Sequence, residues 1–145
     1  MAEIIIKTEN LTRKLENENI VTTLVDNANV EVRAGEFVVI TGPSGSGKSS
    51  LLYLLGLLDK PTSGKIWLAG RDVSTYNDDE LADVRLRELG FVFQFHFLLP
   101  EFSAIENVML PMRKLGKLSE TEMKKRAEEL LISLGMGEQM HKLPK

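Results

Sequence analysis

The sequence predicts an α/β fold, because segments with the patterns of strands and helices alternate along its 145 residues. Glu36–Thr41 is apolar on both sides, which is typical of a strand inside a parallel sheet. A glycine-rich loop follows it. Lys48–Leu58 comes next and is apolar almost all round, which predicts a helix buried against that sheet.

The residues before Glu36 predict antiparallel structure. Ile4–Ile6 is a β-branched run that predicts a short strand, and a polar stretch follows from Lys7 to Asn19. Polar and apolar residues alternate from Asn27 to Arg33, which is the period of a half-buried antiparallel strand. Ala34 and Gly35 predict a turn into the next strand.

After the central helix, the pattern predicts two more strands with a helix between them. Pro61–Gly64 breaks the chain, and Lys65–Ala69 predicts a short strand. An Asn-x-x-Glu capping pattern at Asn77 begins a helix, and Gly90–Phe93 predicts a compact strand after it. The apolar side of that helix is predicted to consist of Leu81, Val84 and Leu89.

Two further capping boxes predict helices in the last third of the chain. Ser103 with Glu106 begins a short helix that we expect Pro111 to end, because proline lacks the N–H that a helix needs. Ser119 with Glu122 begins a longer helix that ends near a glycine. Its predicted apolar face is formed by Met123, Ala127, Leu130, Leu131 and Leu134.

Composition excludes several classes of protein. The chain has 18 Lys+Arg against 21 Asp+Glu, a net charge of −3, which argues against nucleic acid as a partner. It has no cysteine, and its two histidines lie far apart, so disulfide scaffolds and zinc sites are not expected. The longest apolar run, Leu51–Leu58, is far short of the roughly 20 residues of a membrane span, and no secretory signal is visible. We therefore expect a soluble intracellular chain.

A phosphate-binding motif follows the predicted strand. Residues 42–49 read Gly-Pro-Ser-Gly-Ser-Gly-Lys-Ser and satisfy G-x-x-x-x-G-K-[ST] at every fixed position. Glycines let consecutive N–H groups point inward around phosphate oxygens, and the following helix adds its positive end. Lys48 can reach the β- and γ-phosphates, and the Ser49 hydroxyl can ligate Mg²⁺. The predicted nucleotide-binding residues are Gly42, Pro43, Ser44, Gly45, Ser46, Gly47, Lys48, Ser49 and Ser50.

The residues that hydrolysis would need are not visible in the sequence. Hydrolysis requires a carboxylate at the end of a second buried strand. Asp78-Asp79-Glu80 follows polar residues and so lies on a polar turn, and Leu54–Asp59 is the tail of the helix after the loop. The chain therefore carries the binding half of an ATPase and lacks the catalytic half.

Five segments, in order and spacing, resemble the ATP-binding subunit of ABC transporters. These are residues 42–50, 57–64, 90–94, 98–100 and 106–108. Residues 93–102 are most similar to the branch that includes lipoprotein-releasing ATPases and macrolide-export relatives. The resemblance implies a P-loop NTPase core of ABC type with an N-terminal antiparallel β portion. The resemblance also implies the division of the chain. Residues 1–94 would form the β-subdomain and P-loop core, and residues 95–145 would form the Q-loop and the start of the helical subdomain.

The resemblance also implies roles for residues beyond the loop. The resemblance makes Gln94 the Q-loop glutamine, a catalytic residue that contacts Mg²⁺ and the γ-phosphate region. Without the resemblance, the sequence around Gln94 indicates only a solvated side chain at the end of a strand. Phe95–Met112 becomes the groove for a membrane-spanning transporter subunit. Phe95, Phe97, Leu98 and Phe102 are unusually apolar for a loop, and partner surface and ordinary core remain open interpretations. His96 is expected to be structural or interfacial.

Two departures from the family pattern qualify these expectations. The family stacks adenine on an aromatic residue where this chain has Leu15, which leaves the base preference open. The sequence also stops before the family's signature motif, Walker B carboxylates and switch histidine. The resemblance therefore implies a truncated nucleotide-binding domain that binds Mg·ATP weakly, hydrolyses it hardly at all and is marginally stable.

The implied function is that of an ABC-type ATPase which, as a complete homodimer, couples ATP binding and hydrolysis to export or lipoprotein release. The implied location is cytoplasmic, peripheral on the inner face of the plasma (inner) membrane. Two alternatives remain open: a non-catalytic or regulatory P-loop module, and a P-loop kinase acting on a small acceptor.

Overall fold

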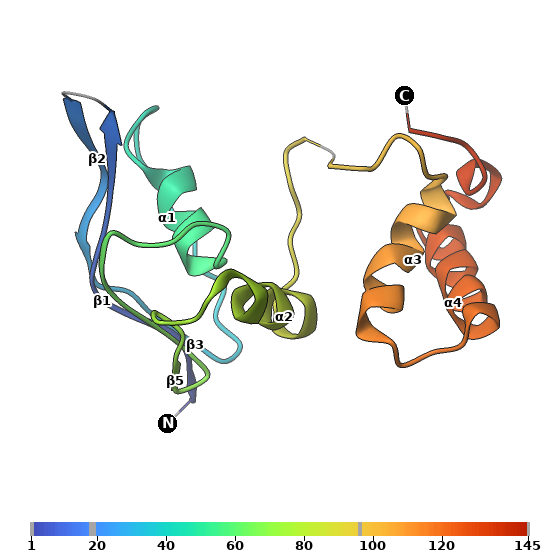
Figure 1. The fold of residues 1–145 in the computed structure, drawn as a ribbon, viewed down its shortest axis with the longest axis horizontal. Coiled ribbons are helices and arrows are strands. Elements are labelled where there is room, and N and C mark those ends of the chain that lie inside the picture. Colours follow the sequence, from blue (N-terminus) through green and yellow to red (C-terminus); the bar gives the residue numbers. More distant parts are fainter. Residues whose placement is uncertain (1, 18–19, 96, 145) are drawn as a thin grey trace. The chain divides into compact units, whose positions relative to one another are not determined.

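The computed structural model describes residues 2–17, 20–95 and 97–144. The chain divides into two compact units, Met1–Arg85 and Leu86–Lys145. The first contains an antiparallel sheet with a helix against it, and the second contains a helical hairpin (Figure 1). Among the described residues, no helix combines the length and the apolar character needed to cross a bilayer.

One long strand organises the sheet of the first unit. β1 (Ile4–Asn17) pairs antiparallel with β2 (Ile20–Ala28), β3 (Glu31–Arg33) and β4 (Ser63–Leu68), and β5 (Arg71–Asp72) adds to β4. The antiparallel strand predicted at 27–33 is confirmed only in part, because β2 ends at Ala28, β3 begins at Glu31, and residues 29 and 30 belong to neither strand. The strand predicted at 65–69 is confirmed as β4, shifted by one to two residues.

The prediction that the first strand ends at Ile6 is wrong, because polar residues continue it. Thr8 is buried, and its Oγ1 donates to the carbonyl of Ala28 at 3.0 Å and accepts from the N–H of Val30 at 2.9 Å. Thr12 is buried as well, and its Oγ1 accepts from the N–H of Asn27 at 3.1 Å. These hydroxyls form hydrogen bonds with backbone groups where the pairing of the strands is irregular. The polar residues here therefore belong to a strand and not to a loop.

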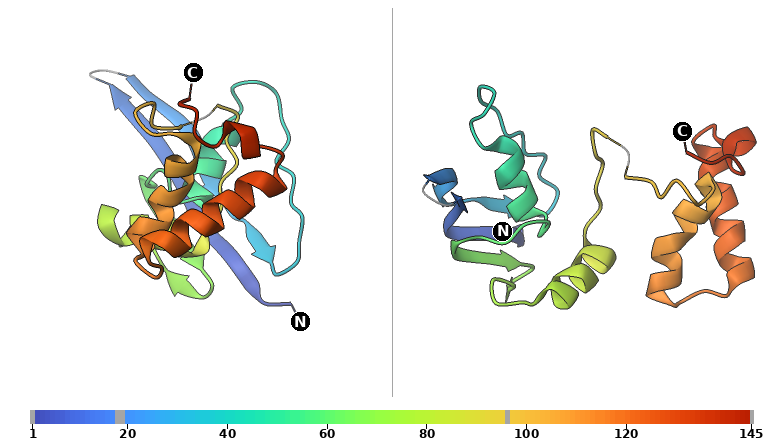
Figure 2. Two further views of the ribbon diagram at one scale, coloured as in Figure 1. Left: turned by 90° about the vertical axis from the view of Figure 1, so that its right-hand side faces the viewer. Right: turned by 45° about the horizontal axis from the view of Figure 1, so that its top comes forward.

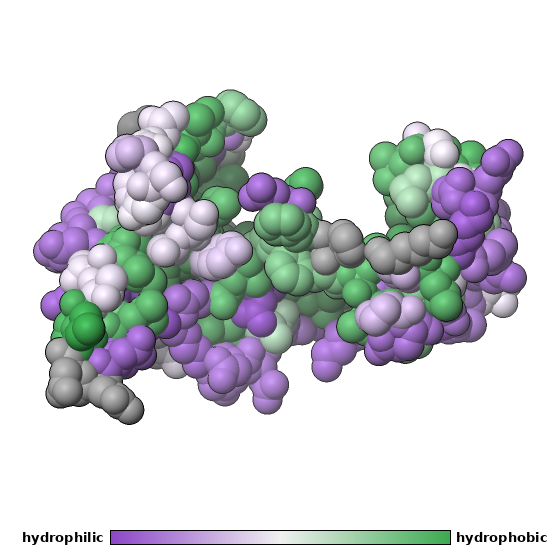
Figure 3. All heavy atoms as spheres, turned by 90° about the horizontal axis from the view of Figure 1, so that it is seen from above, coloured by the Kyte–Doolittle hydropathy of each residue, from purple (hydrophilic) through white to green (hydrophobic). Residues whose placement is uncertain are grey.

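Two predicted strands are absent from the described structure. Residues 36–41 and 90–93 form no ladder, because no described segment pairs with either, and a strand is defined by its partner. Their apolar side chains reach the surface; Phe37 is 93% exposed. Figure 3 shows apolar (green) groups among polar (purple) ones on one face of the chain.

The central helix is shorter and less buried than predicted. α1 spans Lys48–Leu55 and lies against the sheet (Figures 1 and 2), with Leu54 and Leu55 buried but Leu52 and Tyr53 exposed. The chain reverses at Leu57, which has a left-handed φ of 57°, and the Arg85 guanidinium donates to its carbonyl at 2.6 Å. A helix cannot continue through a left-handed residue, so the prediction of a helix to Leu58 is wrong.

The helix predicted at Asn77 is confirmed as α2 (Asp78–Glu88). The Asn77 N–H donates to Oε2 of Glu80 at 2.8 Å, and the Glu80 N–H donates to Oδ1 of Asn77 at 3.0 Å. This exchange is the predicted capping box. Leu81 and Val84 are buried, as the apolar pattern indicated, whereas Leu89 lies just beyond the end of the helix and is half-buried.

The second unit is built on α3 (Ala104–Leu115) and α4 (Glu120–Ser133), followed by the short 3₁₀ helix η1 (Gly137–Gln139). Both predicted capping boxes are present. A shared core holds the two long helices together, and it consists of Ile105, Met109, Met123, Ala127 and Leu131. Of the predicted apolar face of α4, Met123, Ala127 and Leu131 are thus confirmed, whereas Leu130 is half-buried outside this core and Leu134 is exposed.

The prediction that Pro111 ends its helix is wrong. α3 continues through Pro111 to Leu115 and ends at Gly116, which has a left-handed φ of 64°. Proline removes one backbone hydrogen bond from α3, but two other residues of α3, Ile105 and Met109, pack against α4. Tertiary packing therefore outweighs the local cost of the proline.

We predict that the helical hairpin loses stability in acid. Hydrogen bonds from the Ser103 and Ser119 hydroxyls and N–H groups lower the pKa of Glu106 and Glu122, and a hydrogen bond from Arg113 lowers the pKa of Glu120. A carboxyl group whose pKa is lower in the folded than in the unfolded chain stabilises the fold. This stabilisation is complete above the pKa of the unfolded chain, about 4.3, and is lost as the pH falls through the lower pKa of the folded chain. The urea midpoint of the helical circular-dichroism signal should fall between pH 6 and pH 3. Glu122→Gln should reduce this pH dependence, and an unchanged midpoint in wild type would contradict the prediction.

Candidate nucleotide-binding site

The phosphate motif forms one continuous loop that leads into α1. Its carbonyl at Pro43 accepts from the N–H of Ser46 at 3.3 Å, which makes a turn, and the carbonyl of Gly47 accepts the first helical bond from Leu51 at 2.8 Å. Gly45 and Gly47 have left-handed φ values of 80° and 84°. The structure therefore brings all the sequence-predicted loop residues, 42–50, together around the N-terminus of a helix.

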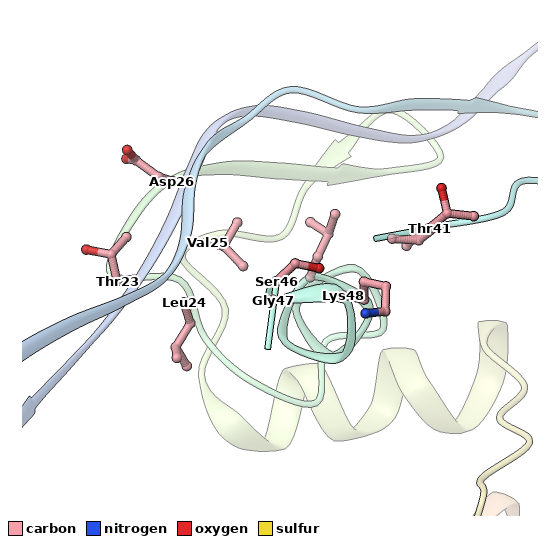
Figure 4. Close-up of a pocket in the computed structure, with 10 residues that line it drawn as sticks. Thr23, Leu24, Val25, Asp26, Thr41, Ser46, Gly47 and Lys48 are labelled. Atoms are coloured by element: carbon pink, nitrogen blue, oxygen red, sulfur yellow. The ribbon is translucent and has the colours of Figure 1, made fainter. Parts of the chain in front are cut away.

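β2 packs directly against this loop. A Cβ added to Gly47 would lie 2.2 Å from the backbone carbonyl oxygen of Leu24, so only glycine allows this approach. In Figure 4, Val25 points toward the loop, and Thr23 and Asp26 point away from it. An open hollow of about 440 Å³ lies between the strand and the loop. Its lining consists of Thr23, Leu24, Val25, Asp26, Ile40, Thr41, Ser46, Gly47, Lys48 and Leu51.

Lys48 is the cation of the site. Its side chain is half-buried, and its Nζ donates to the carbonyl oxygen of Pro43 at 2.7 Å, so the ammonium group is folded over the loop. The first turn of α1 carries no acidic side chain that would offset the positive helix end. The loop thus combines two left-handed glycines, a helix N-terminus and one ammonium group, which suits an anion with several oxygens.

The two serines after Lys48 lie in the first turn of α1, where Ser49 is exposed and Ser50 is half-buried. A hydroxyl next to a phosphate cradle can complete a shell of oxygen ligands around Mg²⁺, which prefers water and few protein groups. The residues present therefore fit a magnesium-bound polyphosphate.

The other predicted site residues belong to the second unit. Gln94 is exposed, and so are Phe95 and Phe97, at 71% and 70%. Phe97 makes an edge-to-face contact with Phe93, whose ring stacks on Phe91. His96 lies outside the described residues. Of the two interpretations of these apolar loop residues, exposure favours a surface for Phe95 and Phe97.

Leu15, at the position where an aromatic residue was expected, lies on β1 opposite Thr22 of β2 and is 40% exposed. Sequence reasoning missed the contribution of β2 to the site altogether. The run Ile20–Val25 is rich in β-branched residues and signals a strand, but nothing in it shows that its backbone meets Gly47.

Comparison with known proteins gives a consistent result. The profile of the ABC transporter family matches residues 25–145. The lipoprotein-releasing system ATP-binding protein LolD 1 of Chlorobium chlorochromatii is 49% identical over 132 residues, 90% of this chain and 54% of the relative. LolD of Aquifex aeolicus is 49% identical over 144 residues, 99% of this chain and 62% of the relative. The chain thus spans little more than half the length of these relatives.

Solved structures agree with the sequence comparison. A dimeric ATP-binding cassette in a post-hydrolysis state, bound to ADP and Pi, superposes with a TM-score of 0.89 at 37% identity. That match covers 97% of this chain and 62% of the other. A second dimeric structure, of a bacterial ABC transporter cassette, gives the same TM-score at 38% identity.

Proposed function

The chain belongs to the ABC transporter family, with the α/β P-loop fold class that its sequence predicted, and from this we propose that it is an ATP-binding subunit coupling ATP to lipoprotein release. The choice of lipoprotein release over other export is supported by the two LolD relatives at 49% identity. The observation that supports ATP binding is the glycine-rich loop at residues 42–49, over which the Lys48 ammonium group lies, hydrogen-bonded to the Pro43 carbonyl.

The chain's own groups divide the work of binding. N–H groups of the loop and of the first turn of α1 donate to phosphate oxygens. Lys48 would exchange its bond to the neutral Pro43 carbonyl for bonds to the β- and γ-phosphates, where the acceptor is charged as well as the donor. The Ser49 hydroxyl would hold Mg²⁺, which neutralises charge on the phosphates. For Gln94, the family resemblance alone supports the proposed role as a second Mg²⁺ ligand. The ADP and Pi bound to the solved cassette support the proposal that this chain binds an adenine nucleotide.

Hydrolysis by these 145 residues alone is proposed to be slow. The sequence contains no run of four apolar residues followed by Asp-Glu, and the Asp26 side chain points away from the loop (Figure 4), so neither offers a carboxylate to orient the attacking water. We assign residues 1–94 to the β-subdomain and P-loop core, and residues 95–145 to the Q-loop and the start of the helical subdomain. Two copies would form the working ATPase, a proposal that the dimeric solved cassettes support.

The proposed partner is a membrane-spanning transporter subunit that contacts Phe95–Met112. The exposed aromatic side chains of Phe95 and Phe97 support this, because exposed apolar loop residues are typical of protein interfaces. Such a contact would place the chain in the cytoplasm, peripheral on the inner face of the inner membrane.

Titration of the isotope-labelled chain with Mg·ATP tests the proposal. We expect saturable shifts of the amide resonances of residues 42–49, with smaller shifts on β2 near Leu24. Amide signals on α4 serve as an internal control, because that helix belongs to the other unit. If the loop signals do not move at millimolar Mg·ATP, the proposed function fails.

We predict that Leu15→Tyr tightens ATP binding by about fivefold. An aromatic ring at this half-exposed position on β1 would offer a stacking surface worth about 1 kcal/mol to a purine base. Isothermal titration calorimetry on wild type and variant measures the change. Leu15→Met is the matched control, since it adds length without a ring, and equal affinities for Tyr and Met would contradict stacking.

A further inference from the structure

The loop from Leu98 to Phe102, which carries part of the proposed partner surface, has a defined shape. Residues 100 and 101 form a turn in which the N–H of Phe102 donates to the carbonyl of Leu99 at 3.2 Å. Leu98 and Leu99 remain more than two-fifths exposed at this turn. An exposed apolar turn with an ordered backbone needs a group that holds it, because burial does not.

That group is the side chain of Asn107, in the second turn of α3. Its Oδ1 accepts from the N–H of Leu99 at 2.9 Å, and its Nδ2 donates to the carbonyl of Leu99 at 3.1 Å. Nδ2 also lies 2.9 Å from the carbonyl of Phe102 and 3.1 Å from that of Ser103. A single half-buried amide therefore ties both ends of the turn to the helix.

The base of the turn is held just as firmly. The N–H and Oγ of Ser103 donate to Oε2 of Glu106 at 2.8 and 2.6 Å, and α3 begins at the next residue. Asparagine is a poor residue for a helix interior, costing several tenths of a kcal/mol relative to alanine. The position therefore carries a residue that weakens α3 slightly and orders the loop before it.

We propose that Asn107 is a positioning residue for partner docking: it preforms the Leu98–Phe102 turn as an apolar ridge that a membrane-spanning subunit binds without ordering the loop first. This rests on the proposed function. Glu101 is the only Asp, Glu, Lys or Arg between Gln94 and Ser103, and it is exposed. The matching partner segment is an amphipathic helix whose apolar face is bordered by a Lys or Arg opposite Glu101.

Preformation lowers the entropy cost of docking, since loop ordering is completed before the partner arrives. In Asn107→Ala, amide exchange at Leu99 and Phe102 should become at least tenfold faster, while amides of α4 keep their rates. Alanine favours the helix, so the urea midpoint of the hairpin should not fall. Lys114→Ala, an exposed position later in α3, is the matched control and should change neither measurement.

Docking is then measured with the full chain and the detergent-solubilised membrane component of the Aquifex aeolicus lipoprotein-releasing system. We expect Asn107→Ala to weaken binding about tenfold through lost preformation. Asn107→Asp keeps the acceptor for Leu99 but not the donors, so it should weaken binding as well, whereas Lys114→Ala should bind like wild type. Phe95→Asp tests the surface itself and should abolish binding.

The outcomes distinguish the positioning role of Asn107 from the proposed partner surface. If Phe95→Asp abolishes binding but Asn107→Ala binds like wild type, the positioning role is overturned and the proposed partner surface stands. If wild type does not bind, or Phe95→Asp binds unchanged, the proposed partner surface is overturned. Unchanged amide exchange at Leu99 in Asn107→Ala would overturn the positioning role whatever the binding data show.

Discussion

Gly47→Ala is expected to lower the free energy of unfolding of the first unit by at least about 3 kcal/mol. A left-handed φ of 84° costs an L-residue about 1–2 kcal/mol. The added Cβ would also lie 2.2 Å from the carbonyl oxygen of Leu24. Because that oxygen belongs to the backbone of β2, it cannot rotate away, so the strand or the start of α1 must move.

Gly45→Ala is the matched control for this prediction. Gly45 lies in the same loop with a φ of 80°, but a Cβ there meets nothing within 4 Å. It should therefore cost only the conformational strain of about 1–2 kcal/mol. Trp67, the single tryptophan of the chain, lies on β4 in this unit, so its fluorescence in urea reports the unfolding. Equal losses for the two variants would show that the contact with Leu24 is not tight.

Lys48→Ala is expected to weaken Mg·ATP binding by roughly 10- to 100-fold. The ammonium group is the one cation in the described part of the loop, and charge-assisted hydrogen bonds contribute about 1.5–3 kcal/mol. The fold should survive, because the variant loses only the bond from Nζ to the nearby Pro43 carbonyl. Calorimetric titration with Mg·ATP measures the change.

Lys125→Ala provides the control for Lys48→Ala. Lys125 is exposed on α4, so removing it changes the net charge by the same amount and leaves the loop untouched. Its affinity for Mg·ATP should equal that of wild type. If Lys48→Ala binds as tightly as Lys125→Ala, the ammonium group has no part in binding, and the cradle must act through its backbone alone.

Elements with a local physical cause were predictable from the sequence. The three capping boxes at Asn77, Ser103 and Ser119 were predicted and are present, because each is closed by residues three apart. The phosphate loop was equally predictable, since its glycines and Lys48 act within eight consecutive positions. The apolar face of α4 followed from helical periodicity and is confirmed by Ala127 and Leu131.

Elements that depend on distant partners were mispredicted. The polar part of β1 became strand because the Thr8 and Thr12 hydroxyls bond to residues 15 to 22 positions away. Residues 36–41 and 90–93 are apolar enough for strands, but no described segment pairs with them. Pro111 stayed inside α3 because its helix packs on α4. In each case the presence or the absence of a non-local contact outweighed a local preference.

The chain's family and fold class, and the proposed phosphate-binding chemistry, thus followed from short motifs, each formed by residues that are close together in the sequence. Only the tertiary structure decided that β2 forms a wall of the proposed nucleotide site and that Asn107 holds the loop before α3. The physical reason is the same for both. Every residue has a backbone carbonyl, so the sequence does not show that the carbonyl of Leu24 or Leu99 makes a particular contact. Its position is set by the folded chain alone.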